Sequence, residues 1–313
     1  MRTLICGSIA YDNIMVFHGH FKDHILPNQI HILNVSFLVP KLRREYGGCA
    51  GNIAYNLKLL GGEPVIMATV GDDAGPYLRR MDELQLVRNF VRQLANTLTA
   101  QAFITTDLDD NQITAFHPGA MEFSHMNHIS DWMNVNLAIV GPDGREGMLQ
   151  HARELTQHEI PFVFDPGQGL PMFSGAELLE FIRQATYVTV NDYEAKMIEE
   201  RTGEQIDALA AVVDALIVTR GASGSTIYTG GGRIEIPCVK AKQVVDPTGC
   251  GDAYRAGLLY GIATGRDWQT TGQLAAVMGA IKIGSAGGQN HEVTREEVEQ
   301  LYRDTFGGDL WPA

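Results

Sequence analysis

Cysteine is scarce in this chain, and its few cysteines show no pairing pattern. The four thiols, at Cys6, Cys49, Cys238 and Cys250, are spread over 313 residues without a Cys-x-x-Cys pair. This spacing indicates neither a zinc site nor a disulfide framework. A reducing compartment suits such a sequence, so we expect a cytoplasmic protein.

Long apolar runs and an excess of basic charge are also missing. No segment approaches the length of apolar sequence needed to cross a bilayer, and Asp12 interrupts the short apolar run that follows Met1-Arg2, which argues against a signal peptide. Only 24 Lys and Arg stand against 37 Asp and Glu, giving a formal net charge of −13. Nucleic acids and anionic membranes are recognised by basic patches, so neither is an expected partner and a small-molecule ligand is favoured.

Three widespread enzyme motifs are absent. The chain has no G-x-x-x-x-G-K-[ST], so any ATP phosphates must be held without a Walker lysine. It has no G-x-G-x-x-G, which excludes a Rossmann dehydrogenase, and no H-E-x-x-H, which excludes that class of zinc hydrolase. The chemistry must therefore be sought in other motifs.

The chain does contain short apolar runs that alternate with helical patterns. The predicted strands are residues 3–7, 65–70, 137–140, 162–165, 187–191 and 215–219. The predicted crossover helices are residues 74–84, 146–158, 192–200 and 206–213. This βαβ succession predicts one doubly wound α/β domain over residues 1–313, with a mostly parallel central sheet flanked by helices. Ligands in such folds gather beyond the carboxyl ends of the strands, where Asp165, Asn191 and Thr219 fall.

The most informative motif is Asp246-Pro247-Thr248-Gly249-Cys250-Gly251-Asp252, directly ahead of an apolar helical run at residues 253–263. Gly249 and Gly251 lack a Cβ, so the backbone can turn tightly and direct N–H groups at a phosphate held by the helix N-terminus. Asp252 would then lie within reach of a hydroxyl that approaches this phosphate, as a general base requires. The alternative is an Asp-Pro type I turn before a glycine-rich helix. A thiol at Cys250 could have a lowered pKa at this helix N-terminus.

A second glycine cluster, Gly47-Gly48-Cys49-Ala50-Gly51-Asn52, opens a predicted helix over residues 50–60. Its glycines allow a ligand to approach the backbone closely, and the Asn52 amide can both donate to and accept from sugar hydroxyls. Asp12, which follows the first predicted strand, could accept hydrogen bonds from vicinal hydroxyls. Each feature alone is also typical of a turn or a helix cap. Their combination with Asp252 favours a polyol substrate.

Two regions break the α/β alternation and are predicted to form β pairs. The pairs are residues 14–16 with 30–40, and residues 99–106 with 112–117. The corresponding segments, about 14–40 and 99–117, would form a small β lid above the ligand crevice and exclude water from it. The alternative is an edge extension of the main sheet.

These motifs resemble the two signatures of the ribokinase-like carbohydrate kinase family, often called PfkB. The matching motifs are Gly47-Gly48-x-x-x-Asn52, Asp246-x-Thr248-Gly249-x-Gly251-Asp252, Asn191-x-x-Glu194 and Thr219-Arg220-Gly221-x-x-Gly224. The similarity covers essentially the whole chain. Cys250 and Pro247 depart from the residues usual in the family, but neither removes the backbone amides of the motif.

The resemblance implies an enzyme that transfers phosphate from ATP to an alcohol. Asp252 corresponds to the catalytic base of the family. The implied anion hole consists of the amides of Gly249, Cys250 and Gly251. The implied substrate contacts are Asp12, Gly47, Gly48 and Asn52.

The resemblance also implies how ATP and metal ions are held. Asn191 and Glu194 match the pair that organises Mg²⁺ and its waters. The nucleotide contacts implied are Thr219, Gly221, Gly224 and, more loosely, Asn290 in the adenine pocket. Asp246 and Thr248 match positions that bind K⁺ in some relatives, and relatives also form homodimers through the lid.

The aromatic residues of the lid segments favour a nucleoside as the substrate. Phe17, Phe21, Phe37, Phe103 and Phe116 could stack a base over the ribose, and alternatively they form a lid core or a dimer contact. The residues 23–27 and 36–40 also resemble those of bacterial adenosine and nucleoside kinases.

We therefore predict an ATP-dependent kinase that acts on the 5′-hydroxyl of a nucleoside, preferring adenosine with some breadth. One alternative is a sugar kinase acting on ribose, fructose or a related polyol. The other is a catalytically silent sugar- or nucleotide-binding regulator, which the intact Asp252 motif disfavours.

Overall fold

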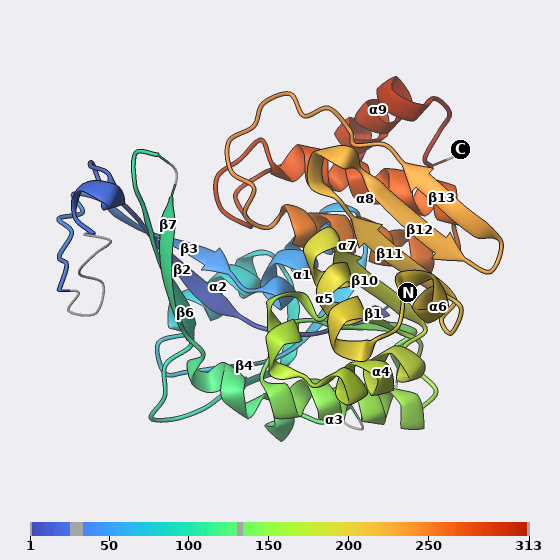
Figure 1. The fold of residues 1–313 in the computed structure, drawn as a ribbon, viewed down its shortest axis with the longest axis horizontal. Helices are drawn as coiled ribbons and strands as arrows, with labels where there is room; N and C mark the ends of the chain where they lie inside the picture. Colours follow the sequence, from blue (N-terminus) through green and yellow to red (C-terminus); the bar gives the residue numbers. More distant parts are fainter. Residues whose placement is uncertain (1, 26–33, 110, 130–133, 312–313) are drawn as a thin grey trace.

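The computed structural model describes residues 2–25, 34–109, 111–129 and 134–311. Part of the predicted first lid segment, residues 26–33, lies outside the described residues. The central sheet consists of β1 (Arg2–Cys6), β4 (Glu63–Val70), β5 (Val87–Gln93), β8 (Leu137–Val140), β9 (Phe162–Phe164), β10 (Tyr187–Asn191), β11 (Ala215–Thr219), β12 (Ser225–Thr229) and β13 (Gly232–Ile236). Their order is β13-β12-β11-β10-β9-β8-β1-β4-β5 (Figure 1).

The pairing within this sheet is doubly wound, as the sequence predicted. All pairs from β5 through β1 to β11 are parallel, and only β12 and β13 are added antiparallel. The chain moves outward from β1 in both directions, so the strand order reverses between β1 and β8. In open α/β sheets this switch point is where ligands bind, beyond the carboxyl ends of the strands.

Helices cover both faces of the central sheet (Figure 1). One face is covered by α3 (Arg145–Gln157), α4 (Gly175–Gln184), α5 (Asp192–Thr202) and α6 (Ile206–Ala210). The other is covered by α1 (Cys49–Leu59), α2 (Gly75–Glu83), α7 (Cys250–Ala263), α8 (Trp268–Lys282) and α9 (Arg295–Phe306). Short 3₁₀ helices are η1 (Phe21–Asp23), η3 (Gly119–Met126), η5 (Gly167–Met172) and η6 (Gly221–Ser223). The predicted helix at residues 206–213 is shorter than expected, because α6 ends at Ala210.

Burial on both faces explains why the central strands could be predicted from apolar runs. In β1, Leu4 and Cys6 pack with α3, α4 and α5, whereas Ile5 between them packs with α1, α7 and α8. Successive side chains of a strand point to opposite faces, so a strand covered on both sides is apolar throughout.

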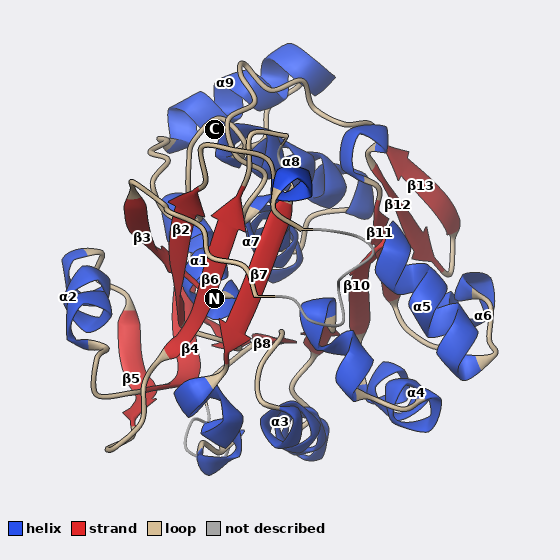
Figure 2. Cartoon of the chain, turned by 60° about the vertical axis from the view of Figure 1, so that its left-hand side comes forward, coloured by secondary structure: helices blue, strands red, loops and turns tan. Residues whose placement is uncertain are grey.

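A second sheet of four strands stands beside the central one, and we call it the small sheet. Its strands are β2 (Ala10–Val16), β3 (Leu42–Gly47), β6 (Ala100–Thr106) and β7 (Gln112–His117), in the order β3-β2-β6-β7. It extends to the left in Figure 1, and Figure 2 turns it toward the viewer. The predicted pair at residues 99–106 and 112–117 is confirmed as the antiparallel pair β6–β7.

The predicted partner of the first lid strand was wrong. β2 pairs antiparallel with Leu42–Gly47, and residues 34–40 contain no strand. The strand β3 reads Leu-Arg-Arg-Glu-Tyr-Gly and is largely exposed, because the small sheet lacks the two covering layers of the central sheet. A search for apolar runs therefore passes over it in favour of the more apolar residues 30–40.

The aromatic residues of the first lid segment pack on one another. The rings of Phe17, Phe21 and Phe37 have centroids 4.9 to 6.0 Å apart, and His24 contacts two of these rings edge-on. Phe17 and Phe21 are buried in this contact. These three phenylalanines therefore form the small core that the sequence analysis gave as an alternative to base stacking.

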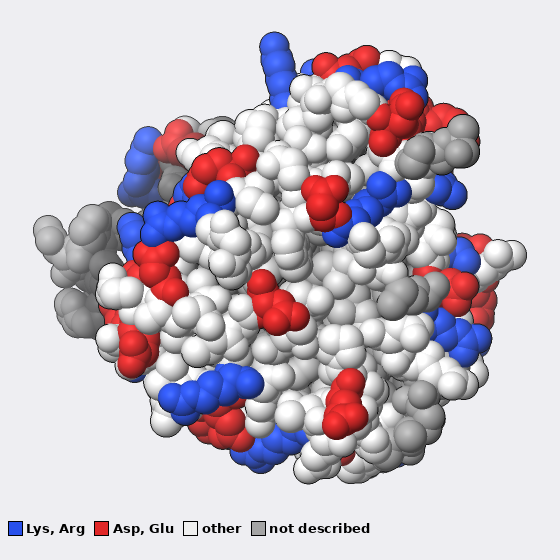
Figure 3. Space-filling model, turned by 90° about the vertical axis from the view of Figure 1, so that its right-hand side faces the viewer, with Lys and Arg blue, Asp and Glu red and all other residues white. Residues whose placement is uncertain are grey.

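The face opposite the small sheet shows acidic and basic side chains interspersed over a mostly uncharged surface (Figure 3). No large basic patch is visible on this face among the described residues. Within the same described part of the chain, no helix combines the length and apolar character required to cross a membrane.

Candidate active site

The start of α7 presents backbone amides without a side-chain cap. Gly249 occupies the N-cap position with φ +77°, a conformation that favours glycine, and a Cβ there would lie 3.1 Å from Gly288 Cα. The Cys250 amide donates to Pro247 O at 3.1 Å. No acceptor within the described residues is found for the amides of Gly251 and Asp252, which precede the first helical bond of α7. Of the three amides in the predicted anion hole, that of Cys250 is therefore engaged, whereas those of Gly249 and Gly251 have no acceptor among the described residues, and the open Asp252 amide lies beside them.

The thiol of Cys250 is not activated by its place at this helix N-terminus. Its Sγ lies 4.0 Å from Asp246 O, and burial raises the pKa of the thiol although the charge of Lys282 opposes that effect. The lowered pKa considered for this thiol is therefore not found, because the effect of burial outweighs that of the Lys282 charge.

Asp252 is held by a chain of hydrogen bonds that joins distant parts of the sequence. Asn52 Nδ2 donates to Asp252 Oδ2 at 2.8 Å, and Gln289 Nε2 donates to Asn52 Oδ1 at 3.1 Å. Gln289 Nε2 also lies 2.6 Å from Tyr77 Oη, whose hydroxyl donates to Gly47 O at 2.7 Å. Both glycine motifs of the sequence thus meet at one site, as the resemblance implied. Gln289 and Tyr77 were missed, and no local motif signals them.

The ionisation of Asp252 suits a general base. Burial raises the pKa of its carboxyl to about 7, and the negative charges of Asp165 and Asp12 add to this effect. The hydrogen bond from Asn52 and the charge of Arg255 act in the opposite direction. A base whose pKa lies near neutral pH combines availability with proton affinity, so Asp252 is well matched to accept a proton from an alcohol.

A buried ion pair anchors α7 to the end of the central sheet. Arg255 Nε and Nη2 donate to the two carboxylate oxygens of Asp165, each at 2.9 Å. Both side chains are buried, and Asp165 directly follows β9. A two-point contact of this kind fixes orientation as well as distance. Arg255 lies one helical turn beyond Asp252, so the pair holds Asp252 at the carboxyl ends of the strands.

Asp12 and the first glycine pair lie on the small-sheet side of this site. Asp12 belongs to β2, and burial raises the pKa of its carboxyl to about 6, with the negative charges of Asp246 and Glu45 adding to the rise. A Cβ on Gly47 would lie 2.3 Å from Asp12 Oδ2, so only glycine leaves room for this carboxylate. Gly48 follows as the N-cap of α1, with φ +84°.

The register of the small sheet shows which phenylalanine side chain projects to the same face of the sheet as Asp12. Residues directly opposite one another in a sheet project to the same face. Asp12 lies opposite Ala102, and Ala102 lies opposite Phe116. Phe116, which is 51% exposed, therefore projects to the face of Asp12, whereas Phe103 follows Ala102 and projects to the other face. The two phenylalanines cannot both stack on one base.

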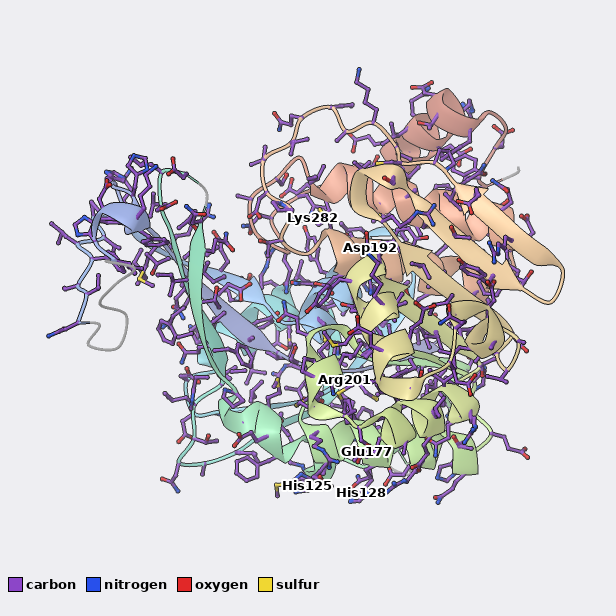
Figure 4. All side chains as sticks on the ribbon, in the orientation of Figure 1. His125, His128, Glu177, Asp192, Arg201 and Lys282 are labelled. Atoms are coloured by element: carbon purple, nitrogen blue, oxygen red, sulfur yellow. The ribbon has the colours of Figure 1, made fainter. Side chains whose placement is uncertain are left out.

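The predicted magnesium pair forms the N-terminal cap of α5. Asn191 Oδ1 accepts from the Glu194 amide at 2.8 Å, and Glu194 Oε2 accepts from the Asn191 amide at 2.8 Å. Burial raises the pKa of Glu194. The two side chains present oxygen donors, which is the chemistry that Mg²⁺ prefers, and their engagement in the cap suits an ion held through water. Figure 4 labels Asp192, the first residue of α5.

The predicted nucleotide residues lie beside this cap. Thr219, at the end of β11, is the register partner of Asn191 at the end of β10. Gly221 and Gly224 follow in the turn that joins β11 to β12, with φ of +51° and +80°. The structure therefore brings five of the six predicted nucleotide and magnesium residues to adjacent strand ends, namely Asn191, Glu194, Thr219, Gly221 and Gly224.

Asn290 is placed on the small-sheet side. Its Nδ2 donates to Glu45 Oε2 at 2.7 Å and to Ala286 O at 3.0 Å. Glu45 is the register partner of Asp12, so Asn290 lies close to the predicted substrate residues. Its role in an adenine pocket stays a prediction.

Asp246 organises the loop ahead of α7. Its Oδ1 accepts from the Thr248 amide at 2.9 Å, and its Oδ2 accepts from the Gly287 amide at 2.8 Å. Burial alone would raise the pKa of Asp246, but these backbone amides hold it below its usual value. The carboxylate thus ties residues 246–248 to the loop that follows α8.

A doubly wound α/β core, a buried carboxyl at an open helix N-terminus and a second carboxylate beside it form an arrangement that suits a small-molecule phosphotransferase. The family model described as "pfkB family carbohydrate kinase" matches residues 12–295. The chain belongs to this family.

Relatives of known structure or function agree with that assignment. A nucleoside kinase of Methanocaldococcus jannaschii is 35% identical over 268 residues, covering 85% of this chain and 88% of the relative. A structure of Burkholderia thailandensis nucleoside kinase in complex with inosine is 57% identical, with a TM-score of 0.91 over 98% of this chain and 99% of that one. The crystal structure of the M. jannaschii enzyme has 32% identity and a TM-score of 0.89 over 97% of this chain and 98% of that one.

Proposed function

We propose that this protein is an ATP-dependent nucleoside kinase that transfers the γ-phosphate to the 5′-hydroxyl of the nucleoside. The observation that carries the proposal is the contact of Asn52 with Asp252 at the open start of α7, in a chain 57% identical to a nucleoside kinase whose structure contains inosine. Relatives with inosine and with ADP and inosine favour purine nucleosides as substrates. Preference for adenosine within that class stays a prediction.

Within this proposal each side chain has a defined task. Asp12 accepts hydrogen bonds from the ribose hydroxyls, and Asp252 accepts the proton of the 5′-hydroxyl as the oxygen attacks phosphorus. The amides of Gly249, Gly251 and Asp252 receive the negative charge of the phosphoryl group, since they have no acceptor among the described residues. Asn52 keeps the Asp252 carboxylate in place during this transfer.

The phosphate donor is assigned to the adjoining strand ends. Thr219, Gly221 and Gly224 would bind ATP, and Asn191 with Glu194 would hold Mg²⁺ through water. When bound, the ion neutralises charge on the phosphates. Phe116 shares the face of Asp12 and is the lid aromatic that we assign to the nucleoside base.

The proposal is tested by an acceptor panel with ATP as the donor, in which ADP release is coupled to a spectroscopic readout. The panel contains adenosine, inosine, guanosine, cytidine, uridine, ribose and fructose, with a reaction lacking acceptor as the control for ATP hydrolysis. We expect turnover with nucleosides, fastest with purines, and none above background with free sugars. Turnover with sugars alone would replace the proposal by a sugar kinase, and binding without turnover would replace it by a regulator.

The small sheet also supports the predicted homodimer. Leu42, Phe103 and Ile113 project to the face of the small sheet opposite Asp12, by the same register, and all three are exposed. An exposed apolar face on a thin sheet is a typical protein interface. Sedimentation velocity of the protein and of its Phe103→Glu variant tests this, and the dimer hypothesis requires the variant to be monomeric.

A further inference from the structure

Lys282, the last residue of α8, carries a fully buried ammonium group. Figure 4 labels it. Its Nζ donates to Asp246 O at 2.9 Å and to Ser285 O at 3.0 Å. Lysine is almost never fully buried without partners, because removing its charge from water is costly. Here the recorded hydrogen-bond partners are backbone carbonyls, and no carboxylate forms an ion pair with it among the described residues.

The ammonium joins the two loops that build the start of α7. Ile283 O, adjacent to Lys282 in the chain, accepts from the amides of Val245 and Asp246 at 2.8 and 3.2 Å. The Asp246 carboxylate in turn accepts from the Gly287 amide at 2.8 Å. Lys282 thus closes a ring of contacts between residues 245–246 and 283–287. A Cβ on Gly249 would lie 3.6 Å from Lys282 Cε, so the side chain runs directly beneath the N-cap of α7.

The surrounding charges are those of the proposed active site. Burial lowers the pKa of Lys282, and the negative charges of Asp246 and Asp252 counter this effect. The same ammonium contributes to lowering the pKa of His291 to about 4, although burial is the larger cause there. A fixed positive charge therefore lies close to the group that would accept the proton.

The residues around Lys282 do not fit the potassium ion that the family resemblance implied at Asp246 and Thr248. The Asp246 carbonyl oxygen already accepts from the ammonium, and both carboxylate oxygens of Asp246 accept from backbone amides. Carbonyl oxygens are ligands that a K⁺ ion would need, and here the carbonyl oxygens of Asp246 and Ser285 both accept from the Lys282 ammonium.

We propose that the Lys282 ammonium is a built-in replacement for a monovalent cation, and that it positions the start of α7 so that the kinase works without K⁺. This inference rests on the proposed function, since it assigns Lys282 a place beneath the phosphoryl-binding amides of that same site. Lys282 is a positioning residue, because no reacting group contacts it. It supplies positive charge at the α7 N-terminus and holds residues 245–249 against the loop after α8.

The first experiment measures the unmodified protein in KCl and in choline chloride at equal ionic strength. We expect the same kcat, the same KM for ATP and the same ADP affinity by calorimetry in both salts. Saturable activation or tighter ADP binding in K⁺ would overturn the proposal. ADP binding is measured without an acceptor, so this result stands apart from the acceptor panel, whose failure alone would overturn the proposed function.

The second experiment compares Lys282→Met with Lys58→Met, an exposed lysine of α1 that serves as the matched control. We expect Lys282→Met to lose roughly 10²-fold in kcat, the cost of misplacing a catalytic segment by about 1 Å, and to recover part of it in KCl or NH₄Cl but not in choline chloride. Lys58→Met should match the unmodified protein in every salt. Full activity of Lys282→Met in choline chloride would overturn the proposal. If this variant does not fold by circular dichroism, Lys282→Ala with added NH₄Cl and the salt comparison on the unmodified protein decide the question.

Discussion

Two helices begin near the carboxyl ends of the central strands, and their N-termini are finished in opposite ways. α5 starts with a complete capping box, in which Asn191 and Glu194 exchange side-chain and backbone hydrogen bonds. α7 starts with Gly249 in a left-handed conformation and no side-chain cap. A cap residue satisfies amides that would otherwise need water or a ligand.

The two helix starts differ in purpose, because the cap of α5 stabilises its own helix whereas the uncapped start of α7 leaves amides available for a ligand. The α5 cap stabilises the helix by itself, and we propose that its oxygens reach a magnesium ion only through water. The α7 start leaves amides open beneath Asp252, and the surrounding contacts of Asn52, Arg255 and Lys282 supply the rigidity that a cap would have given. The α7 start, which other elements hold in place without capping it, is therefore where we place the phosphoryl-binding site.

The largest effect is expected for Asp252→Asn at the α7 start. Removing a positioned general base should lower kcat by roughly 10²- to 10⁴-fold. Nucleoside and ADP affinities should change little, since an amide at position 252 can still hydrogen-bond with Asn52. Steady-state kinetics and calorimetry measure the two quantities. A variant with unchanged kcat would show that Asp252 is not the base.

The same variant has a stability consequence whose sign is fixed by the pKa. Burial raises the pKa of Asp252 from 3.8 to about 7, so the native state favours the protonated carboxyl and loses stability as the pH rises through this interval. Asp252→Asn should therefore melt at a higher temperature than the unmodified protein at pH 8, and the gain should shrink as the pH approaches about 4. A constant difference at all pH values would contradict the raised pKa.

The next effect compares glycines of similar backbone conformation at α7 and α5. Gly249 has φ +77° and Gly203, at the end of α5, has φ +76°, but a Cβ at Gly203 meets nothing within 4 Å. Alanine at either position should cost about 1–2 kcal/mol of unfolding free energy. Only Gly249→Ala should also lower kcat/KM, by roughly tenfold or more, because it displaces the open amides. If both variants lose the same unfolding free energy and have the same kcat/KM, then Gly249 has no special role in the reaction.

The third effect concerns the pH dependence of kcat/KM, which should rise with pH as Asp252 loses its proton near pH 7. The hydrogen bond from Asn52 lowers the pKa of Asp252, so Asn52→Leu should move this rise to higher pH. The charge of Asp12 raises the same pKa, so Asp12→Asn should move the rise to lower pH. Shifts in the same direction for both variants would mean that another group controls the profile.

Much of the architecture could be predicted because its physical cause is local. The central strands are buried on both faces and are therefore apolar throughout, and α1, α2, α3, α5 and α7 follow from helical periodicity. β3 was missed because an exposed strand carries charges, and the hairpin β12–β13 was missed although residues 230–232 are three glycines typical of a turn. α4 begins with a Ser174–Glu177 capping box, a sequence signal that was overlooked.

The residues of the candidate site also fall into two groups, those that a local motif predicts and those that depend on long-range contacts. Asp252, Asn52 and Gly249 belong to motifs whose spacing expresses a local backbone geometry, so the sequence indicated them. Lys282 and Gln289 act through contacts with residues far away in the chain, such as Asp246 and Asn52, and these contacts depend on how the loop after α8 closes. No periodicity or spacing encodes such a closure. The contact between Asn52 and Asp252, two hundred residues apart, likewise became visible only in three dimensions.

The smallest effect is expected at the α5 cap, where Asn191→Ala can be compared with Thr294→Ala. Thr294 caps α9 with the same capping-box pattern. Each substitution should cost about 1 kcal/mol of unfolding free energy, the usual value of an N-cap, measured by denaturant titration. Only Asn191→Ala should also raise the Mg²⁺ concentration needed for half-maximal activity, since Asn191 supplies an oxygen donor beside Glu194 and Thr294 does not. If both variants need the same Mg²⁺ concentration for half-maximal activity, the cap of α5 has only a structural role. In that case the α7 start alone would serve the reaction.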